Sequence, residues 1–303
     1  MLMKAVDSYL SIRRAAGFEL EVPEYLLRSF ARFATGHGET HVTTRTAIEW
    51  ASQAPSLSQR DHRLKTVIRM ARHLKAEDER HEVPPNGVFG YRKTRRVPFL
   101  YTQTDINRLI QAASQLGPPG SLRPHTYSTL LALLSVTGLR ISEALALCLG
   151  DVTADGLIIR RTKFQKSRLA PLHETTDAGL ERYLVRRRRA APTDDHVFIS
   201  LQGTGLSRSG VQWTFRNLLK TIGLEPKPGG RRPRIHDLRH GFAIRVLEDC
   251  PEGRDNVGRH MLALSTYLGH ANISDTYWYL EATPNLMRDI ADASEAFLKG
   301  DRL

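Results

Sequence analysis

The chain has 303 residues, 41% of them hydrophobic and 25% charged, and its formal net charge at pH 7 is +12. The length fits about two domains of ~150 residues each, and the positive charge favours a polyanionic partner such as nucleic acid. No apolar run approaches the ~18 residues needed to cross a bilayer and the N-terminus lacks a signal-peptide pattern, so we expect a cytoplasmic, nucleoid-associated protein with no membrane partner.

Residues 1–82 are predicted to form an N-terminal helical bundle. Apolar residues recur at helical spacing from Leu2 to about Leu74, and breaks near Gly17, Gly36 and Pro55 divide the segment into about four helices. Basic residues crowd the last of these helices, which favours DNA contact, although a solvated helix face is the alternative. The predicted DNA contacts in this segment are Arg69, Arg72 and Lys75.

Residues 83–101 form the predicted linker. Prolines and glycines recur through it and oppose any regular element, while the basic side chains between them suit contact with a DNA backbone. An ordinary exposed connector is the alternative. The predicted DNA contacts in the linker are Arg92, Lys93, Arg95 and Arg96.

Residues 102–303 are predicted to form a second domain, which begins with the helix-start pattern Thr102-x-x-Asp105. Helical spacing continues over 124–137, 141–148, 174–189, 207–222, 235–248, 257–268 and 272–280. Strand-like residues at 157–159 and 168–172 are expected to pair. The expected fold class is mainly α, an N-terminal helical bundle plus a mixed, mostly helical domain with a small antiparallel β-sheet.

Arg140 is the first residue whose position suggests chemistry. It follows Gly138 at a loop-to-helix junction, where a guanidinium and backbone N–H groups can face a phosphate. Glu143 lies three residues further on. It is either a simple surface ion-pair partner or a supporting group that orients Arg140.

A second chemical group comprises His236, Arg239 and His240, at positions i, i+3 and i+4. On a helix these side chains share roughly one face, so one segment offers an acid or base beside a guanidinium. An exposed polar helix start is the structural alternative. Two histidines four apart also suit a metal, but no Glu follows His236 and no third ligand has recognisable spacing. We therefore predict no metal.

An aromatic cluster near the C-terminus contains a candidate nucleophile, although core or interface packing is the alternative for such a cluster. Tyr277 and Tyr279 are two residues apart, about 200° around a helix, so only one of them can face a shared site. In chain order, groups that can hold a phosphodiester and move its protons precede a tyrosine that can attack phosphorus. These residues are Arg140, Lys163, His236, Arg239, His270 and Tyr279.

Four segments together resemble the motif blocks of the tyrosine recombinase, or phage integrase, family, most closely its mobile-element integrases. They are Thr137–Glu143 (TGLRISE), Thr162–Arg168 (TKFQKSR), His236–His240 (HDLRH) and Leu268–His270 (LGH) with Tyr279 nine residues later. The resemblance covers roughly residues 100–282. It implies a catalytic domain at 102–303, a DNA-binding bundle at 1–82, and a catalytic set comprising Arg140, Lys163, His236, Arg239, His270 and Tyr279, supported by Glu143 and His240.

Two features depart from the family's pattern. The stretch before His270 is longer than usual around Pro251–Val257, and Phe164 stands where glycine is common. The second departure leaves Lys166 as an alternative to Lys163 for the general acid. We predict Lys163 as the acid and assign DNA contacts to Lys166, Arg231 and Arg232.

The resemblance implies a site-specific recombinase that cleaves and rejoins DNA strands through a 3′-phosphotyrosyl intermediate, with no metal, nucleotide or other cofactor. Its expected partners are double-stranded DNA carrying recombination sites and further copies of the chain, assembled as a tetramer on DNA. The amphipathic residues 283–303 dock on a neighbour or pack on their own domain. The alternatives are DNA relaxation of the type IB topoisomerase kind and a catalytically inactive DNA-binding regulator.

Overall fold

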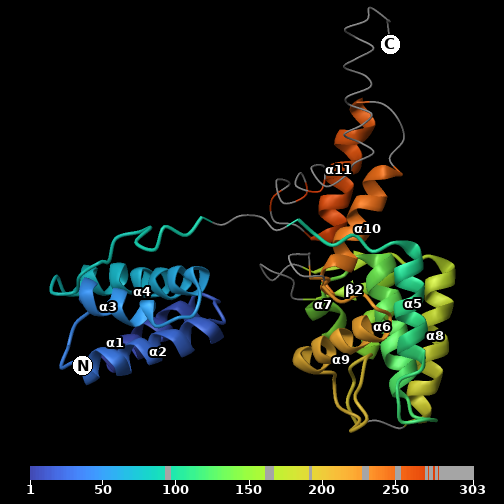
Figure 1. Ribbon diagram of the computed structural model, residues 1–303, viewed down its shortest axis with the longest axis horizontal. Helices are drawn as coiled ribbons and strands as arrows, with labels where there is room; N and C mark the ends of the chain where they lie inside the picture. Colours follow the sequence, from blue (N-terminus) through green and yellow to red (C-terminus); the bar gives the residue numbers. More distant parts are fainter. Residues whose placement is uncertain are drawn as a thin grey trace, which may run out of the picture. The chain divides into compact units, whose positions relative to one another are not determined.

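The structure is a computed structural model that describes residues 1–92, 97–160, 167–190, 193–226, 232–249 and 254–269, together with Asn272, Thr276 and Tyr279. The chain divides into two compact units, Met1–Arg96 and Val97–Leu303 (Figure 1). This division falls inside the segment predicted as a linker. Among the described helices, none is both long and apolar enough to span a membrane.

The first unit is a bundle of the predicted kind. Ser56 and Thr43 begin two of its helices, because their side-chain oxygens accept hydrogen bonds from the Gln59 and Thr46 backbone N–H groups. The apolar stripes of the helices meet in a core that includes fully buried Phe30. The helices are α1 (Leu2–Ala15), α2 (Glu21–Gly36), α3 (Thr44–Ser52) and α4 (Leu57–Glu77).

The second unit is mostly helical with a small antiparallel sheet, so the predicted fold class is confirmed. The predicted capping box is present, since Thr102 and Asp105 bond each other's backbone N–H groups at the start of α5. The helices of this unit are α5 (Gln103–Ser114), α6 (Arg123–Thr137), α7 (Ile141–Leu145), α8 (Glu174–Arg189), α9 (Arg208–Thr221), α10 (Asp237–Glu248) and α11 (Arg254–Leu268), with a 3₁₀ turn at Leu149–Asp151.

The sheet has the strand order β1 (Val152–Thr153), β2 (Gly156–Ile159) and β3 (Arg168–Ala170), with antiparallel pairing throughout. The sequence predicted β2 and β3 but not β1, which is too short to show a period. Leu157 faces Ala170 across the sheet, and both side chains are buried in the core of the unit.

Two predicted helices differ most from the structure, each at one end. The helix expected over 141–148 ends at Leu145, and Cys148 is already extended and pairs with His196 in an isolated β-bridge before the 3₁₀ turn. The helix expected from 257 already begins at Arg254, so part of the longer stretch around Pro251–Val257 extends α11. The helix expected over 272–280 lies largely outside the described residues.

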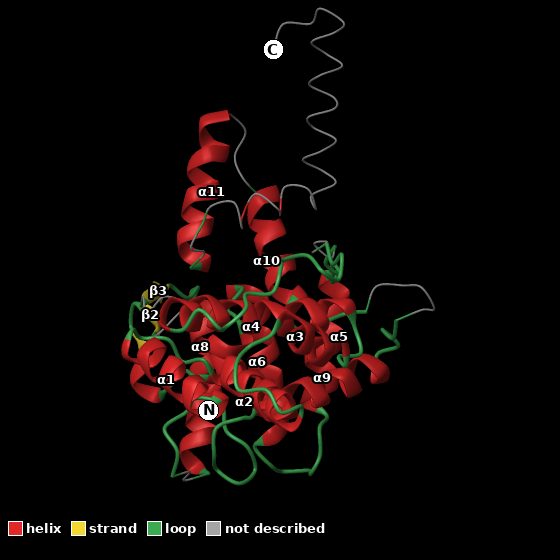
Figure 2. Cartoon of the chain, turned by 90° about the vertical axis from the view of Figure 1, so that its left-hand side faces the viewer, coloured by secondary structure: helices red, strands yellow, loops and turns green. Residues whose placement is uncertain are grey.

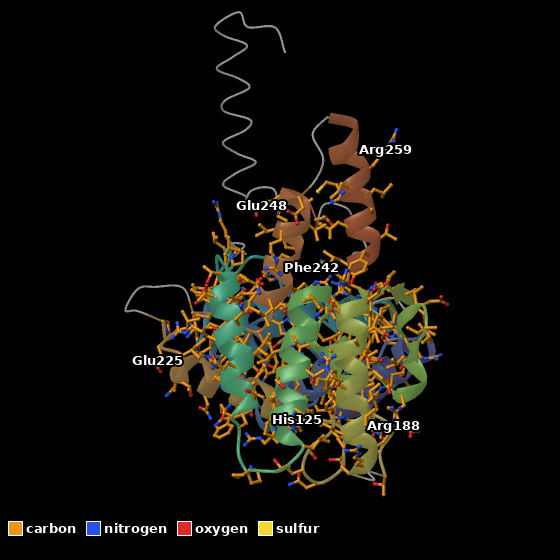
Figure 3. The ribbon with its side chains drawn as sticks, turned by 90° about the vertical axis from the view of Figure 1, so that its right-hand side faces the viewer. His125, Arg188, Glu225, Phe242, Glu248 and Arg259 are labelled. Carbon is orange, nitrogen blue, oxygen red and sulfur yellow. The ribbon has the colours of Figure 1, made fainter. Side chains whose placement is uncertain are left out.

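α6 is the central helix of the second unit, and it packs against α5, α8 and α10. Leu130 and Leu133 on α6 are fully buried, which explains why this helix is apolar on nearly all sides. α10 and α11 lie side by side at one end of the unit (Figures 1 and 2). Figure 3 shows Phe242 where α10 meets the body of the unit, with Glu248 and Arg259 on the projecting part.

Candidate active site

The junction between α6 and α7 positions Arg140. Gly138 ends α6 with a φ of +59°, and a Cβ at this residue would lie 2.4 Å from Cδ1 of Phe242 on α10. Glycine is needed here, since L side chains rarely adopt positive φ and the aromatic ring leaves no room. The Gly138 carbonyl accepts a hydrogen bond from Arg239 Nη1 at 2.8 Å, which joins the junction to α10. Arg140 follows as the N-cap of α7.

Glu143 binds two guanidiniums at once. Its Oε1 accepts from Arg140 Nη1 at 2.6 Å and its Oε2 from the Arg140 backbone N–H at 3.0 Å, so the predicted pair is present. Arg168 adds a bidentate pair, with Nη1 at 3.1 Å from Oε1 and Nη2 at 2.8 Å from Oε2. Burial raises the pKa of Glu143, but hydrogen bonds from Arg168 and Arg140 outweigh it and hold the pKa at about 2. The carboxylate is therefore ionised at neutral pH.

Three arginines converge on the carbonyl end of α11, just before His270 in the sequence. The last carbonyls of a helix lack partners within it and carry the negative end of its dipole, so cationic donors stabilise them. The three segments that supply the arginines are far apart in the sequence. The bonds are Arg168 Nε to Tyr267 O (2.7 Å), Arg239 Nη2 to Leu268 O (2.8 Å) and Arg140 Nη2 to Gly269 O (3.2 Å).

Arg239 is the most deeply buried of these arginines, with only 2% of its side chain exposed. Burial, and then the charge of Arg140, lower its pKa to about 10, while the charges of Tyr279 and Glu143 act in the opposite direction. Arg239 is still protonated at neutral pH. The charges of Arg140, Glu143 and Tyr279 all act on the pKa of Arg239, so these groups lie close enough to interact electrostatically.

Two histidine rings connect this site to Tyr279. The ring centroids of His236 and His240 lie 4.7 Å apart, and those of His240 and Tyr279 lie 5.5 Å apart. Although part of His236 is exposed, partial burial and then the charges of Arg239 and Arg234 lower its pKa to about 4. His236 is therefore uncharged at neutral pH and able to accept a proton.

Tyr279 is only 3% exposed and belongs to a small apolar cluster between α10 and α11. Its neighbours in this cluster include Ala243, Ile244 and Leu264. Of the two tyrosines considered from the sequence, Tyr279 is thus the one that the described residues place beside the arginines. Tyr277 lies outside the described residues.

The structure accordingly brings together Arg140, Glu143, His236, Arg239, His240 and Tyr279. Two of the predicted catalytic residues, Lys163 and His270, lie outside the described residues. Sequence reasoning missed Arg168 as a member of the site and treated it only as part of a strand. The available signal was its position in the Thr162–Arg168 motif block. The predicted DNA contacts outside the described residues are Lys93, Arg95, Arg96, Lys166 and Arg231.

Of the predicted DNA contacts in the first unit, Arg69, Arg72 and Lys75 are all exposed on α4. Their spacing places them along one side of the helix, while Leu74 and Met70 turn into the core. Arg92 is also exposed. All four side chains are thus open to solvent, and Arg69 also donates a hydrogen bond to Thr66 Oγ1 at 3.2 Å.

A second basic surface adjoins the active site. A cavity of about 530 Å³ lies between α9 and the segment before α10, and His236 forms part of its wall. Among the described residues that line it, none is acidic. Its arginines include the predicted DNA contact Arg232, and the full set is Arg208, Arg216, Arg232 and Arg234.

One cluster of potential metal ligands occurs among the described residues, in the first unit. The ligand atoms of His41, Asp78 and His81 lie within 4.8 Å of one another. His81 Nδ1, however, accepts a hydrogen bond from the Val42 N–H at 3.0 Å, and Arg80 donates to both oxygens of Asp78. A neutral imidazole that accepts a hydrogen bond at Nδ1 carries its proton on Nε2, so neither ring nitrogen of His81 offers a lone pair to a metal. The cluster is therefore explained by hydrogen bonds within the first unit.

Comparison with known proteins gives the family. The sequence of residues 100–285, more than half of the chain, matches the phage integrase family. The chain belongs to this family, the tyrosine recombinases, and it is a site-specific DNA recombinase.

Individual proteins that resemble this chain are consistent with the assignment. The integrase/recombinase y4rB of Sinorhizobium fredii is 41% identical over 297 residues, which cover 94% of each protein. The tyrosine recombinase XerD of Halalkalibacterium halodurans is 33% identical over 201 residues, 65% of this chain and 62% of XerD. The structure of the Tn1549 transposon integrase with transposon right end DNA has a TM-score of 0.65 at 18% identity, covering 95% of this chain and 98% of that one. This last likeness is one of fold.

Proposed function

We propose that Tyr279 is the nucleophile of the recombinase and that Arg140 and Arg239 hold the phosphodiester it attacks. The observation that carries this proposal is the convergence of two guanidiniums from α7 and α10 with a phenol from a third segment. Arginine suits the role because its planar fork grips two phosphate oxygens. Negative charge that develops on those oxygens during attack is stabilised by fixed donors.

The proton movements follow from the same groups. A tyrosine with an ordinary pKa of ~10 is about one part in a thousand ionised at pH 7, which costs roughly 4 kcal/mol. Uncharged His236 accepts the Tyr279 proton, and His240 supports both rings. As the bond from the phenolic oxygen to phosphorus forms, the bond to the 5′ oxygen breaks, and Lys163 donates a proton to that oxygen.

The products are a 3′-phosphotyrosyl bond and a free 5′ hydroxyl. The number of phosphoester bonds is unchanged, so rejoining to another strand needs no ATP. Nothing in these steps calls for a metal. Lys163 and His270 enter through their place in the family's pattern, His270 as a further donor to the phosphate.

The DNA path is proposed to run over two basic surfaces. The arginines of the cavity beside His236 suit the backbone next to the scissile phosphate, because Arg208, Arg216 and Arg232 make no hydrogen bond or ion pair within the described part of the chain. Arg69, Arg72 and Lys75 on α4 suit a separate stretch of the DNA backbone. The unit 1–82 would thus bind DNA while 102–303 catalyses, with 83–101 joining them.

We further propose that the chain acts as a tetramer at specific sites of a mobile element, at the nucleoid. The Tn1549 integrase is a transposon protein, and a lambda integrase tetramer has been solved on a Holliday junction. Strand exchange between two duplexes requires four cleavages, which four copies of one active site supply.

The test first requires a DNA sequence that the protein binds. Duplexes that bind the full chain are selected from a random-sequence library, and the selected sequence is then made with a nick beside the cleaved phosphate so that religation is prevented. In EDTA, we expect a protein–DNA complex that survives SDS. An inactive regulator would bind the duplex without forming this complex, and a topoisomerase would relax a plasmid that lacks the selected sequence. Either result contradicts the proposal.

A further inference from the structure

Arg168 is a nearly buried arginine whose hydrogen-bonding nitrogens are all engaged by the protein. It is the first residue of β3, its side chain is 13% exposed, and its three guanidinium nitrogens donate to Tyr267 and Glu143. Three of the five N–H donors of the guanidinium are used in this way, and the low exposure of the side chain restricts the access of a phosphate to the others. Its contribution to the reaction must therefore pass through the groups it binds.

The first of these groups is Glu143. Arg168 takes both carboxylate oxygens in a fork, which fixes the rotation of the carboxylate. In that rotation Oε1 faces Arg140 Nη1 at 2.6 Å and Oε2 faces the Arg140 N–H at 3.0 Å. Without Arg168, the carboxylate could turn toward Arg239, whose Nη1 lies 4.0 Å from Oε2. Arg168 thus determines how the Arg140 guanidinium is aimed.

The second group is the end of α11. Arg168 Nε donates to the Tyr267 carbonyl at 2.7 Å, and two residues later Gly269 has a φ of +66°. A Cβ on Gly269 would lie 2.9 Å from Arg168 Nη1, so the backbone passes directly over the guanidinium. His270 is the next residue. Arg168 therefore also sets where the chain leaves α11 toward His270 and Tyr279.

We propose that Arg168 is a positioning residue of the recombinase, which aligns Arg140 through Glu143 and the end of α11 through Tyr267. The inference rests on the proposed role of Arg140 as a phosphate clamp. In this proposal one side chain links β3, α7 and α11, and so keeps the groups that these elements carry in fixed relative positions. Because Arg168 does not touch the phosphate, its loss slows cleavage while DNA affinity stays unchanged.

The test measures single-turnover cleavage of the nicked duplex at saturating protein, together with DNA affinity and the thermal unfolding temperature. Arg168→Gln should slow cleavage about 10–100-fold, by analogy with groups that orient metal ligands. Arg168→Lys keeps the charge but not the fork, so its cleavage rate should lie between those of Arg168→Gln and the wild type. Arg160→Ala is the matched control. Arg160 follows β2 and pairs with Asp151 rather than Glu143, so its loss should leave the rate unchanged.

A double variant separates positioning from general stability. If Arg168 acts through Arg140, then Arg168→Gln in an Arg140→Ala background should cost almost nothing more, because the clamp is already gone. A methylphosphonate at the cleaved position, which lacks one negative oxygen, should likewise reduce the defect of Arg168→Gln. Additive losses, an undiminished defect on methylphosphonate, or wild-type cleavage by Arg168→Gln would overturn the proposal.

The experiment distinguishes an unfolded variant, a failure of the proposed function and a failure of the positioning role. Should Arg168→Gln unfold at the assay temperature, the same two comparisons are made with Arg168→Lys, whose retained charge keeps Glu143 paired. If the wild-type chain itself forms no covalent complex with DNA, the proposed function fails irrespective of Arg168. If the wild type and Arg168→Gln cleave at equal rates, only the positioning role fails.

Discussion

Glu143 is the residue on which the charge balance of the site depends. A single carboxylate holds Arg140 and Arg168, and Arg239 lies 4.0 Å away. Glu143→Gln removes the charge while keeping the shape. Since breaking a buried ion pair costs about 3–5 kcal/mol, we expect a loss of this order in the free energy of unfolding at pH 7, measured with urea.

The same residue predicts a pH dependence. The folded pKa of Glu143 is about 2 and its ordinary value 4.5, so its stabilising contribution is complete above pH 4.5 and is lost as the pH falls toward 2. The difference in unfolding free energy between wild type and Glu143→Gln should therefore be constant from pH 7 to 5 and shrink below pH 4.5. A difference that stays constant down to pH 3 would contradict the assigned pKa.

Among the elements, the α6–α7 junction tolerates substitution poorly. Gly138→Ala should cost about 1–2 kcal/mol for the positive φ and about 1–3 kcal/mol more for the collision with Phe242. Gly120→Ala is the matched control, because Gly120 has a φ of +75° and no atom within 4 Å of its added Cβ. Measured with urea, the free energy of unfolding of Gly138→Ala should be well below that of Gly120→Ala. Equal losses would mean that Phe242 moves aside.

Elements with a clear period were predictable from the sequence, and their geometry at the site was not. The apolar spacing of α6, α8 and α9 predicted their ranges nearly to the residue, the capping box predicted the start of α5, and the motif blocks predicted Arg140, His236 and Arg239. The role of Arg168 could not be read in this way. It arises because β3 pairs with β2 and runs beside the end of α11, a contact between residues about 100 positions apart.

For the whole molecule, the net charge of +12 predicts salt-sensitive DNA binding. Each phosphate contact that is lost should reduce the slope of log affinity against log salt by about 0.9. We expect this change for Arg216→Ala, from the cavity beside His236, and for Arg72→Ala on α4. Arg188→Ala, which removes an exposed arginine paired with Glu181, should leave the slope unchanged. Filter binding between 50 and 200 mM salt, a typical range for this effect, provides the measurement.

An unchanged slope in Arg216→Ala would remove the cavity from the proposed DNA path. An unchanged slope in Arg72→Ala would remove α4. The two surfaces belong to different units, so each result bears on one of them alone.

The most direct measurement identifies the residue that becomes joined to DNA. The full chain is incubated in EDTA with the nicked target duplex, the covalent complex is digested with protease, and the peptide that retains nucleotide is sequenced by mass spectrometry. The account predicts a nucleotide on Tyr279, a complex that forms normally in Tyr277→Phe, and none in Tyr279→Phe. A nucleotide on Tyr277, or a complex that persists in Tyr279→Phe, would contradict it.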